Sequence, residues 1–339
     1  MSPQFVDFDA DGTLDIVAGT YDGSPHLARG DGKSWQQPVP ILDAKGHRIA
    51  IRQYWDHAKK RWFGMASDGV GDGQPRGHAT SAVAFDHDGD GDLDLLLGDH
   101  ESGRIWMRRN DGTRQQPAFI DQNEPLHAGG APIDVPGSVA TMRVLDWNGD
   151  GRLDLLVSSM GDANTARPPG GGVWLYLHAG DGPKASFLAP QLLVPVSDKG
   201  AIDAPSRPDS GLYVDAGDVD GDGDPDLVVG AYSHWTPSGR ELTANEQARL
   251  PVLREELAAL DRQLTELTKQ AQQASADAPA AERSKRYSEA FAAQKEARDH
   301  NRAERTRRQA ELDGYLPPAR REAFVWLYTN TTPRPAAPR

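Results

Sequence analysis

The chain has 339 residues, of which 37% are hydrophobic, and it carries a formal net charge of −13 at pH 7. The absence of cysteine excludes disulfides, thiol catalysis and cysteine-ligated metal clusters, and the acidic balance argues against binding to the phosphate backbone of nucleic acid. No run of about 18 apolar residues occurs, so a membrane span is excluded. The 35 glycines and 25 prolines together exceed the average share of about 12%, which indicates many turns.

One nine-residue acidic pattern occurs four times along the chain, with Asp at positions 1, 5 and 9, Asp or Asn at position 3, and Gly at position 6. The four copies begin at Asp7, Asp86, Asp146 and Asp218. Each copy follows an apolar lead such as Ala82-Val-Ala-Phe85 and precedes an apolar run such as Leu95-Leu-Leu-Gly98. Runs of this length, bounded by Gly and Asp, are typical of strands.

A further strand follows each loop and its apolar run. Examples are Arg104-Ile-Trp-Met107 and Val173-Trp-Leu-Tyr176, and a turn such as Asn110-Asp111-Gly112 leads into a closing strand. A four-stranded unit of this kind cannot bury both faces alone, and radially arranged blades are the obvious way to repeat it. The sequence therefore predicts a mainly β chain, a β-propeller of four motif-bearing four-stranded blades, of which the last is incomplete.

The repeats are expected near residues 1–40, 79–121, 138–193, and 211–239 together with 321–332. The propeller would thus span residues 1–239 plus 321–332. Residues 41–78 contain no acidic loop and are expected to form an outer hairpin, with a degenerate repeat as the alternative.

Four acidic side chains crowded into one loop would repel one another, and a hard cation at the centre would remove that repulsion. When the chain curls, the side chains at positions 1, 3 and 5 converge, position 7 offers its backbone carbonyl, and position 9 closes the shell. Glycine at position 6 of every copy fits the sharp turn. Oxygen-only ligands in a flexible shell favour Ca²⁺ over Mg²⁺, so we expect up to four Ca²⁺ ions.

The candidate metal ligands occupy positions 1, 3, 5, 7 and 9 of the four loops: Asp7, Asp9, Asp11, Thr13 and Asp15; Asp86, Asp88, Asp90, Asp92 and Asp94; Asp146, Asn148, Asp150, Arg152 and Asp154; Asp218, Asp220, Asp222, Asp224 and Asp226. An EF-hand would need Glu at position 12, which here falls on an apolar residue inside each expected strand, so the loops lie between strands. The alternative is four plain Asx turns without metal. Ala10 in the first copy and Asn148 and Arg152 in the third give that alternative more weight there than in the other two copies, although a metal site is still expected in all four.

These loops, each followed by an apolar stretch such as Leu-Leu-x-Gly, resemble the FG-GAP/VCBS repeat family, the integrin-α-type β-propellers. The resemblance covers about residues 1–239 and 321–332. It extends to bacterial VCBS-repeat proteins with a helical insertion in the last blade. It implies calcium in the loop between the first two strands of each blade and an extracytoplasmic setting, secreted or periplasmic. It implies no catalytic activity.

The chain departs from the family at its two ends. Integrin-type propellers usually have more blades than the four motifs found here. The first copy lacks the lead-in of the others, and the last copy lacks its outermost strand. We therefore expect an N-terminally shortened form that also lacks a signal peptide.

Residues 240–320 differ from the repeats, because they hold 15 Lys and Arg against 14 Asp and Glu and no glycine before Gly314. Leucines spaced by three and four from Leu250 to Leu267 form a helical seam, and Thr243-Ala-Asn-Glu246 is typical of a capping box. With a second, charged helix over about 280–313, the segment is predicted as an antiparallel helical hairpin, coiled-coil in character. It is read either as a docking or dimerisation arm or as a solvated decoration. Residues 333–339 are expected to be a disordered tail.

The sequence favours a calcium-binding module that interacts with an unidentified protein or carbohydrate ligand, without nucleic acid and without a membrane span. One alternative is a propeller-based carbohydrate-active enzyme, a lyase or hydrolase. Another is a structural oligomer that self-associates through residues 240–320. No catalytic residue is proposed, since neither a Ser/His/Asp order nor a His-x-x-x-His spacing stands out.

Overall fold

The computed structural model describes residues 3–64, 78–161, 169–180, 185–276, 278–279 and 282–331. The expected disordered tail, residues 333–339, lies outside this range. The chain divides into two compact units. The first comprises Met1–Ala201, Pro205–His234 and Arg321–Arg339, and the second comprises Ile202–Ala204 and Trp235–Arg320.

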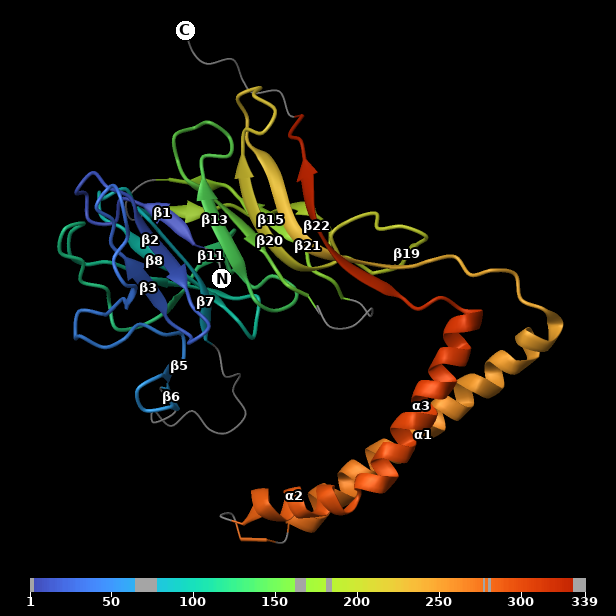
Figure 1. The fold of residues 1–339 in the computed structure, drawn as a ribbon. Helices are drawn as coiled ribbons and strands as arrows, with labels where there is room; N and C mark the ends of the chain where they lie inside the picture. Colours follow the sequence, from blue (N-terminus) through green and yellow to red (C-terminus); the bar gives the residue numbers. More distant parts are fainter. Residues whose placement is uncertain are drawn as a thin grey trace. The chain divides into compact units, whose positions relative to one another are not determined.

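Four antiparallel sheets dominate the first unit (Figure 1). The first sheet has the order β1-β2-β3-β4, with bounds Gln4–Val6, Asp15–Gly19, Pro25–Ala28 and Val39–Pro40. The second has the order β7-β8-β9-β10, with bounds Ala79–Phe85, Asp94–Asp99, Ile105–Arg108 and Glu124–Pro125. The third has the order β13-β14-β15-β18, with bounds Thr141–Leu145, Asp154–Ser158, Val173–Tyr176 and Gln191–Val194.

The fourth sheet has three long strands. They lie in the order β20-β21-β22, with bounds Ser210–Gly217, Asp226–Thr236 and Arg320–Tyr328, and the short β19 (Ala201–Ile202) also pairs with β21. Only β22 follows the helical segment in the chain, yet it takes the third place in this sheet.

Two smaller elements complete the β structure. A hairpin of β5 (Gln53–Asp56) and β6 (Arg61–Gly64) lies within residues 41–78, where an outer hairpin was expected; residues 65–77 of that segment are outside the described ranges. The other element is a four-stranded sheet of two-residue strands in the order β12-β11-β17-β16. Their bounds are Ala131–Pro132, His127–Ala128, Ser186–Phe187 and His178–Ala179.

The long apolar runs are unbroken because the inner strands are covered on both faces. Leu95 and Leu97 of β8 pack into the core between the first and second sheets, whereas Leu96 packs into the core between the second and third. In β14, Leu156 belongs to the core shared with the fourth sheet. Alternate residues of one strand thus serve two cores, which explains why no polar residue interrupts these runs.

The first unit is therefore a succession of sheets, each packed on the next. Strand β7 contacts β2 and β13, and β13 contacts β20. Among the described residues no sheet closes on itself, since every strand order ends at two edges. The chain is mainly β, as the sequence predicted, while a closed propeller belongs to the proposals below.

The second unit is helical. It consists of α1 (Ala244–Ala276), α2 (Arg283–Ala293) and α3 (Lys295–Tyr315). At the start of α1, the Thr243 backbone amide donates to Glu246 Oε2 (2.9 Å) and the Glu246 amide donates to Thr243 Oγ1 (3.4 Å), so the capping box is confirmed. The expected single second helix is wrong in detail, because Gln294, with φ −91°, separates α2 from α3, and neither Gly nor Pro marks the break.

Helices α1 and α3 lie antiparallel, because early residues of α1 contact late residues of α3 and late residues of α1 contact early residues of α3. Arg249 pairs with Glu311 at 2.8 Å near one end, and Arg298 Nη2 donates to Thr268 Oγ1 at 3.3 Å toward the other. Leu253 and Ala271 are fully buried in this pairing. Within the described ranges, no helix has both the length and the apolar content required to cross a membrane.

Candidate metal centre

Each acidic loop forms the turn between the first two strands of one sheet. The loops join β1 to β2, β7 to β8, β13 to β14, and β20 to β21. Positions 4 and 6 both adopt left-handed backbone conformations. In three loops glycine fills both positions, as with Gly89 (φ 79°) and Gly91 (φ 96°), whereas the first loop places Ala10 at position 4 with φ 57°. The first loop is therefore the strained copy, because L-residues with side chains disfavour this region.

The carboxylate at position 1 curls the loop around itself. Asp86 accepts hydrogen bonds from the amides of Gly89 (2.7 Å) and Gly91 (3.0 Å). Asp218 accepts the equivalent bonds from Gly221 (2.7 Å) and Gly223 (3.1 Å). In the other two loops the position 1 aspartates, Asp7 and Asp146, likewise accept hydrogen bonds from backbone amides of their own loop. Backbone curvature of this kind turns the side chains at positions 3 and 5 inward.

Three loops bring the carboxylates of positions 1, 3 and 5 together. In each, one oxygen from every member lies within 4.8 Å of the others: Asp7, Asp9 and Asp11; Asp86, Asp88 and Asp90; Asp218, Asp220 and Asp222. The third loop has the same backbone bonds, but position 3 is Asn148, whose amide donates to Asp150 Oδ2 at 3.1 Å. Donor sets made only of oxygen fit a hard divalent cation.

The backbone amide of position 7 donates a hydrogen bond to the side chain of position 5, as in an Asx turn. The amides of Thr13, Asp92, Arg152 and Asp224 donate to the position 5 carboxylates at 2.8, 3.0, 2.9 and 3.1 Å. These bonds fix the peptide that leads into position 7, the residue whose carbonyl was the expected ligand. The Thr13 hydroxyl also donates to Asp11 at 2.6 Å, and this hydrogen bond lowers the pKa of the Asp11 carboxyl.

The aspartate at position 9 accepts backbone hydrogen bonds that stabilise its sheet, a role that the sequence did not predict. Its side chain accepts one amide from position 2 of its loop in three copies, at 3.1 Å (Phe8), 3.0 Å (Trp147) and 2.9 Å (Val219). In all four copies it also accepts an amide from just beyond the third strand, from Gly30, Asn110, His178 and Asn330 at 2.7, 2.8, 2.8 and 2.9 Å.

These bonds join three strands at one end of each sheet. Asp15, Asp94, Asp154 and Asp226 are all nearly or fully buried. None of them is among the clustered oxygens of positions 1, 3 and 5. A repeated Asp near a strand start was visible in the sequence, but its partner amides lie in a distant part of the chain, so the pattern alone could not reveal the bond.

Burial, with added repulsion from neighbouring carboxylates, raises the pKa of two aspartates in the second loop. Burial, followed by the charges of Asp90 and Asp88, raises the pKa of Asp92 to about 6. Burial also raises the pKa of Asp94 to about 7, against the lowering effect of the Asn110 amide. A divalent cation among these carboxylates would oppose both increases, because it favours the charged form.

Basic side chains distinguish the first and third loops from the other two. Arg29 forms an ion pair with Asp9, and Arg114 donates to the Asp7 carbonyl. In the third loop Arg152 lies 3.9 Å from Asp150. Within the described parts of the chain, no Lys or Arg pairs with the carboxylates at positions 1, 3 and 5 of the second and fourth loops. The carboxylates of the second and fourth loops are therefore the least neutralised by basic side chains.

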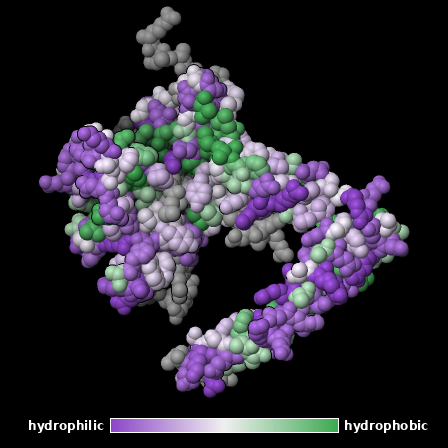
Figure 2. All heavy atoms as spheres, viewed as in Figure 1, coloured by the Kyte–Doolittle hydropathy of each residue, from purple (hydrophilic) through white to green (hydrophobic). Residues whose placement is uncertain are grey.

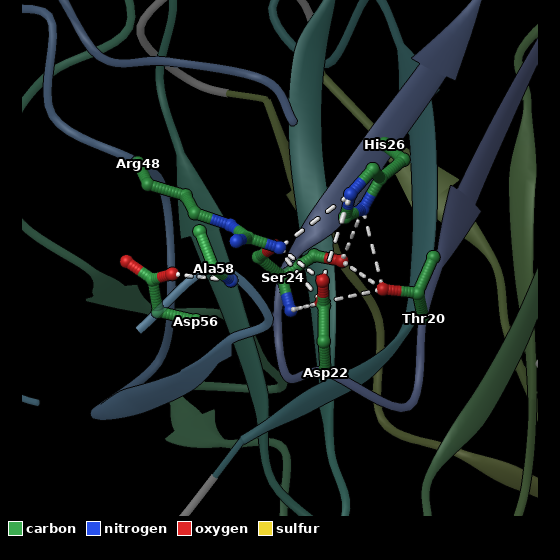
Figure 3. A network of polar contacts seen from close by, with 7 residues as sticks. All are labelled: Thr20, Asp22, Ser24, His26, Arg48, Asp56 and Ala58. Atoms are coloured by element: carbon green, nitrogen blue, oxygen red, sulfur yellow. Dashed lines mark hydrogen bonds and ion pairs between the residues drawn. The ribbon is translucent and has the colours of Figure 1, made fainter. Parts of the chain in front are cut away.

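A polar network at the opposite end of the first sheet, in the turn between β2 and β3, contains Ser, His and Asp side chains (Figure 3). Asp22 accepts from Thr20 Oγ1 (2.5 Å) and Ser24 Oγ (3.2 Å) and pairs with Arg48. Ser24 is fully buried and its hydroxyl donates to Asp22 rather than to His26. Burial lowers the pKa of His26. This arrangement ties Arg48 to the turn and offers no accessible nucleophile.

A comparison with known protein families identifies repeats in the middle of the chain. Two stretches of the chain, residues 86–157 and 146–229, match the model of the FG-GAP-like repeat. They contain the second, third and fourth loops, and the third loop is shared by both matches. Residues 86–229 thus carry repeats of the FG-GAP type, and such repeats suggest a repeat-based binding or interaction module. No curated protein matches the chain.

Proposed function

We propose that the chain is a calcium-binding β-propeller module of the FG-GAP/VCBS type that binds a protein or carbohydrate ligand outside the cytoplasm. The observation that carries the proposal is the recurrence of one loop geometry, with three carboxylates within 4.8 Å, at the same turn of three sheets. Each ion would stabilise the fold rather than perform chemistry, since it would lie at a hairpin turn among backbone bonds.

The ligand residues of the proposal are positions 1, 3 and 5 of each loop and the carbonyl of position 7, while the position 9 carboxylate, which accepts backbone amides, supports the loop beside the ion. The second and fourth loops are proposed as the tighter sites. In the first loop Arg29 already neutralises Asp9, and in the third Asn148 removes one charge. Extracellular calcium modules bind at roughly 10⁻⁴–10⁻³ M. Calcium at ten times its dissociation constant would stabilise the fold by about 1.4 kcal/mol per site.

Two further features belong to the proposal. The succession of four packed sheets supports the proposal that each sheet is one blade of a propeller. The helical segment 240–320 is then an insertion between β21 and β22 of the last blade. The extracytoplasmic setting and the bacterial subtype rest on the resemblance of the loops to the FG-GAP/VCBS family. Residues 333–339 are proposed as a tail outside the blades.

Isothermal titration with CaCl₂ tests the proposal on the full chain. We expect saturable binding in the wild type and the loss of about one site in the double variant D88N/D90N. The control is D134N, because Asp134 is an exposed carboxylate outside the loops that pairs with Arg104. Absence of calcium binding in the wild type, or equal losses in the two variants, would overturn the assignment.

A further inference from the structure

The helical unit contains an open groove at the break between α2 and α3. Its volume is about 600 Å³, which falls in the range typical of small-molecule sites. Helix α1 supplies Asp261 and Leu264, helix α2 supplies Phe291 and Ala292, and helix α3 supplies the other side chains that line it. Helix α1 packs against both α2 and α3, so three helices shape this helical groove (Figure 1).

Basic side chains outnumber acidic ones on the walls of the helical groove. The charged lining residues are Lys295, Arg298, Arg302 and Arg305, against Asp261 and Asp299. Asp299 is already paired, since its Oδ2 lies 2.7 Å from Lys295 Nζ. Asp261 is paired as well, with Arg305 Nε at 2.8 Å from its Oδ1. The pKa of Asp299 is lowered mainly by Lys295, with a smaller effect of Arg302. Among the described residues, Arg298 and Arg302 form no ion pair with any carboxylate.

Neutral partners hold Arg298 in place. Its Nη2 donates to Thr268 Oγ1 at 3.3 Å and to Gln294 Oε1 at 3.1 Å, and its guanidinium lies over the Phe291 ring, 3.9 Å from the centroid. These contacts fix the direction of the charge without cancelling it, and no described partner uses its Nη1. Arg302 lies four residues further along α3 and therefore on the same face of the helix. Two guanidinium groups thus point their donors toward one region.

Apolar side chains complete the helical groove. Phe291 is 43% exposed and Leu264 is half-buried. Below them Asn301 is almost fully buried, and its Nδ2 donates to the carbonyl of Leu260 at 2.9 Å and to Gln263 Oε1 at 3.0 Å, which ties α3 to α1. Figure 2 shows that the helical unit is mainly hydrophilic on the face in view, with small apolar patches. An exposed aromatic ring beside uncancelled guanidinium groups can cover the apolar body of an anionic ligand.

We propose that the helical groove binds an organic anion that has one carboxylate and a compact apolar body, such as an aromatic acid. The carboxylate accepts hydrogen bonds from Arg302 and from Nη1 of Arg298, and the apolar body lies against Phe291. Hydrogen bonds between guanidinium and carboxylate are about twice as strong as neutral ones. Burial of the apolar body adds to the affinity. All groups involved belong to the helical unit, so this binding is separate from the proposed calcium sites.

Isothermal titration of the full chain with 2-naphthoate, in metal-free buffer, tests the proposal. We expect saturable binding in the wild type and about tenfold weaker binding in R302Q, since glutamine keeps a donor but loses the charge. The matched control is R307Q, because Arg307 is an exposed arginine of the same helix that pairs with Glu304 and does not line the groove. R307Q should bind 2-naphthoate as the wild type does.

Two further ligands and one further variant separate the charge from the apolar contact. Neutral 2-naphthamide and acetate should each bind about tenfold more weakly than 2-naphthoate, since one lacks the charge and the other lacks the apolar body. F291A should also weaken 2-naphthoate binding, with an unchanged far-UV circular dichroism spectrum. A wild type that does not bind 2-naphthoate, an R302Q variant that binds as tightly as the wild type, an equal loss in R307Q, or 2-naphthamide binding as tight as that of 2-naphthoate would overturn the proposal. Without calcium present, these results leave the proposed metal sites untouched.

Discussion

At the scale of single residues, the aspartates of one loop divide into two groups. Those at positions 1, 3 and 5 lie on an exposed turn and face one another, whereas the one at position 9 is buried against backbone amides. The first group gathers carboxylate oxygens that could hold a cation. The second group stabilises the sheet by its hydrogen bonds whether or not an ion is present, since its partners are part of the chain.

Replacing Asp154 with alanine tests the role of position 9. The amides of Trp147 and His178 would lose their acceptor in a buried place. We expect a loss of about 2–5 kcal/mol in the free energy of unfolding, because each unpaired buried amide costs about 1–3 kcal/mol. Urea unfolding should show this loss both with calcium and with chelator. The matched variant D150N, at position 5, should lose stability in calcium only; a D154A loss that vanishes in chelator would contradict this division.

The raised pKa of Asp92 leads to a pH-dependent prediction for the metal-free protein. Its folded-state pKa, about 6, lies above the ordinary aspartate value of 3.8, so the folded state holds the proton more tightly. The stabilisation is present below about pH 4 and is lost as pH rises through about 6. In chelator, D92N should therefore match the wild type near pH 4 and exceed its stability near pH 7.5. Chemical denaturation at both pH values measures this, and an unchanged difference between them would refute it.

At the scale of elements, much of the fold could be predicted from local patterns. The acidic loops, the apolar runs after them and the capping box at Thr243 are short-range signals, and the structure places strands and a helix start there. The mainly β class is confirmed. What could not be predicted has no local signal: neither Gly nor Pro marks the break at Gln294, and the ion pair of Arg29 with Asp9 joins a strand end to a loop.

The helical segment offers a test at the same scale. Leu253 is fully buried between the helices, whereas its neighbour Val252 is 50% exposed. L253A should destabilise the helical unit by about 2–5 kcal/mol, because it opens a cavity in the pairing of α1 with α3. V252A should change stability by no more than about 0.5 kcal/mol. Circular dichroism at 222 nm during urea unfolding measures both, and equal losses would mean that Leu253 is not a packing residue.

At the scale of the whole molecule, we expect calcium and the sheets of the first unit to form one cooperative system. Each proposed ion would lie where one strand turns into the next, beside an aspartate that joins the third strand to the same end. Filling the loops would therefore remove repulsion at the ends of several sheets at once. The helical unit, whose contacts are ion pairs and leucine packing, should respond little.

Thermal unfolding of the full chain in millimolar calcium and in chelator tests this most directly. If each filled site adds about 1.4 kcal/mol, the midpoint of the sheet transition should rise by about 5–20 °C in calcium. Magnesium at the same concentration should produce a smaller rise, since it gives up its waters reluctantly. Identical midpoints with calcium and with chelator would contradict the claim that the four acidic turns are cation sites.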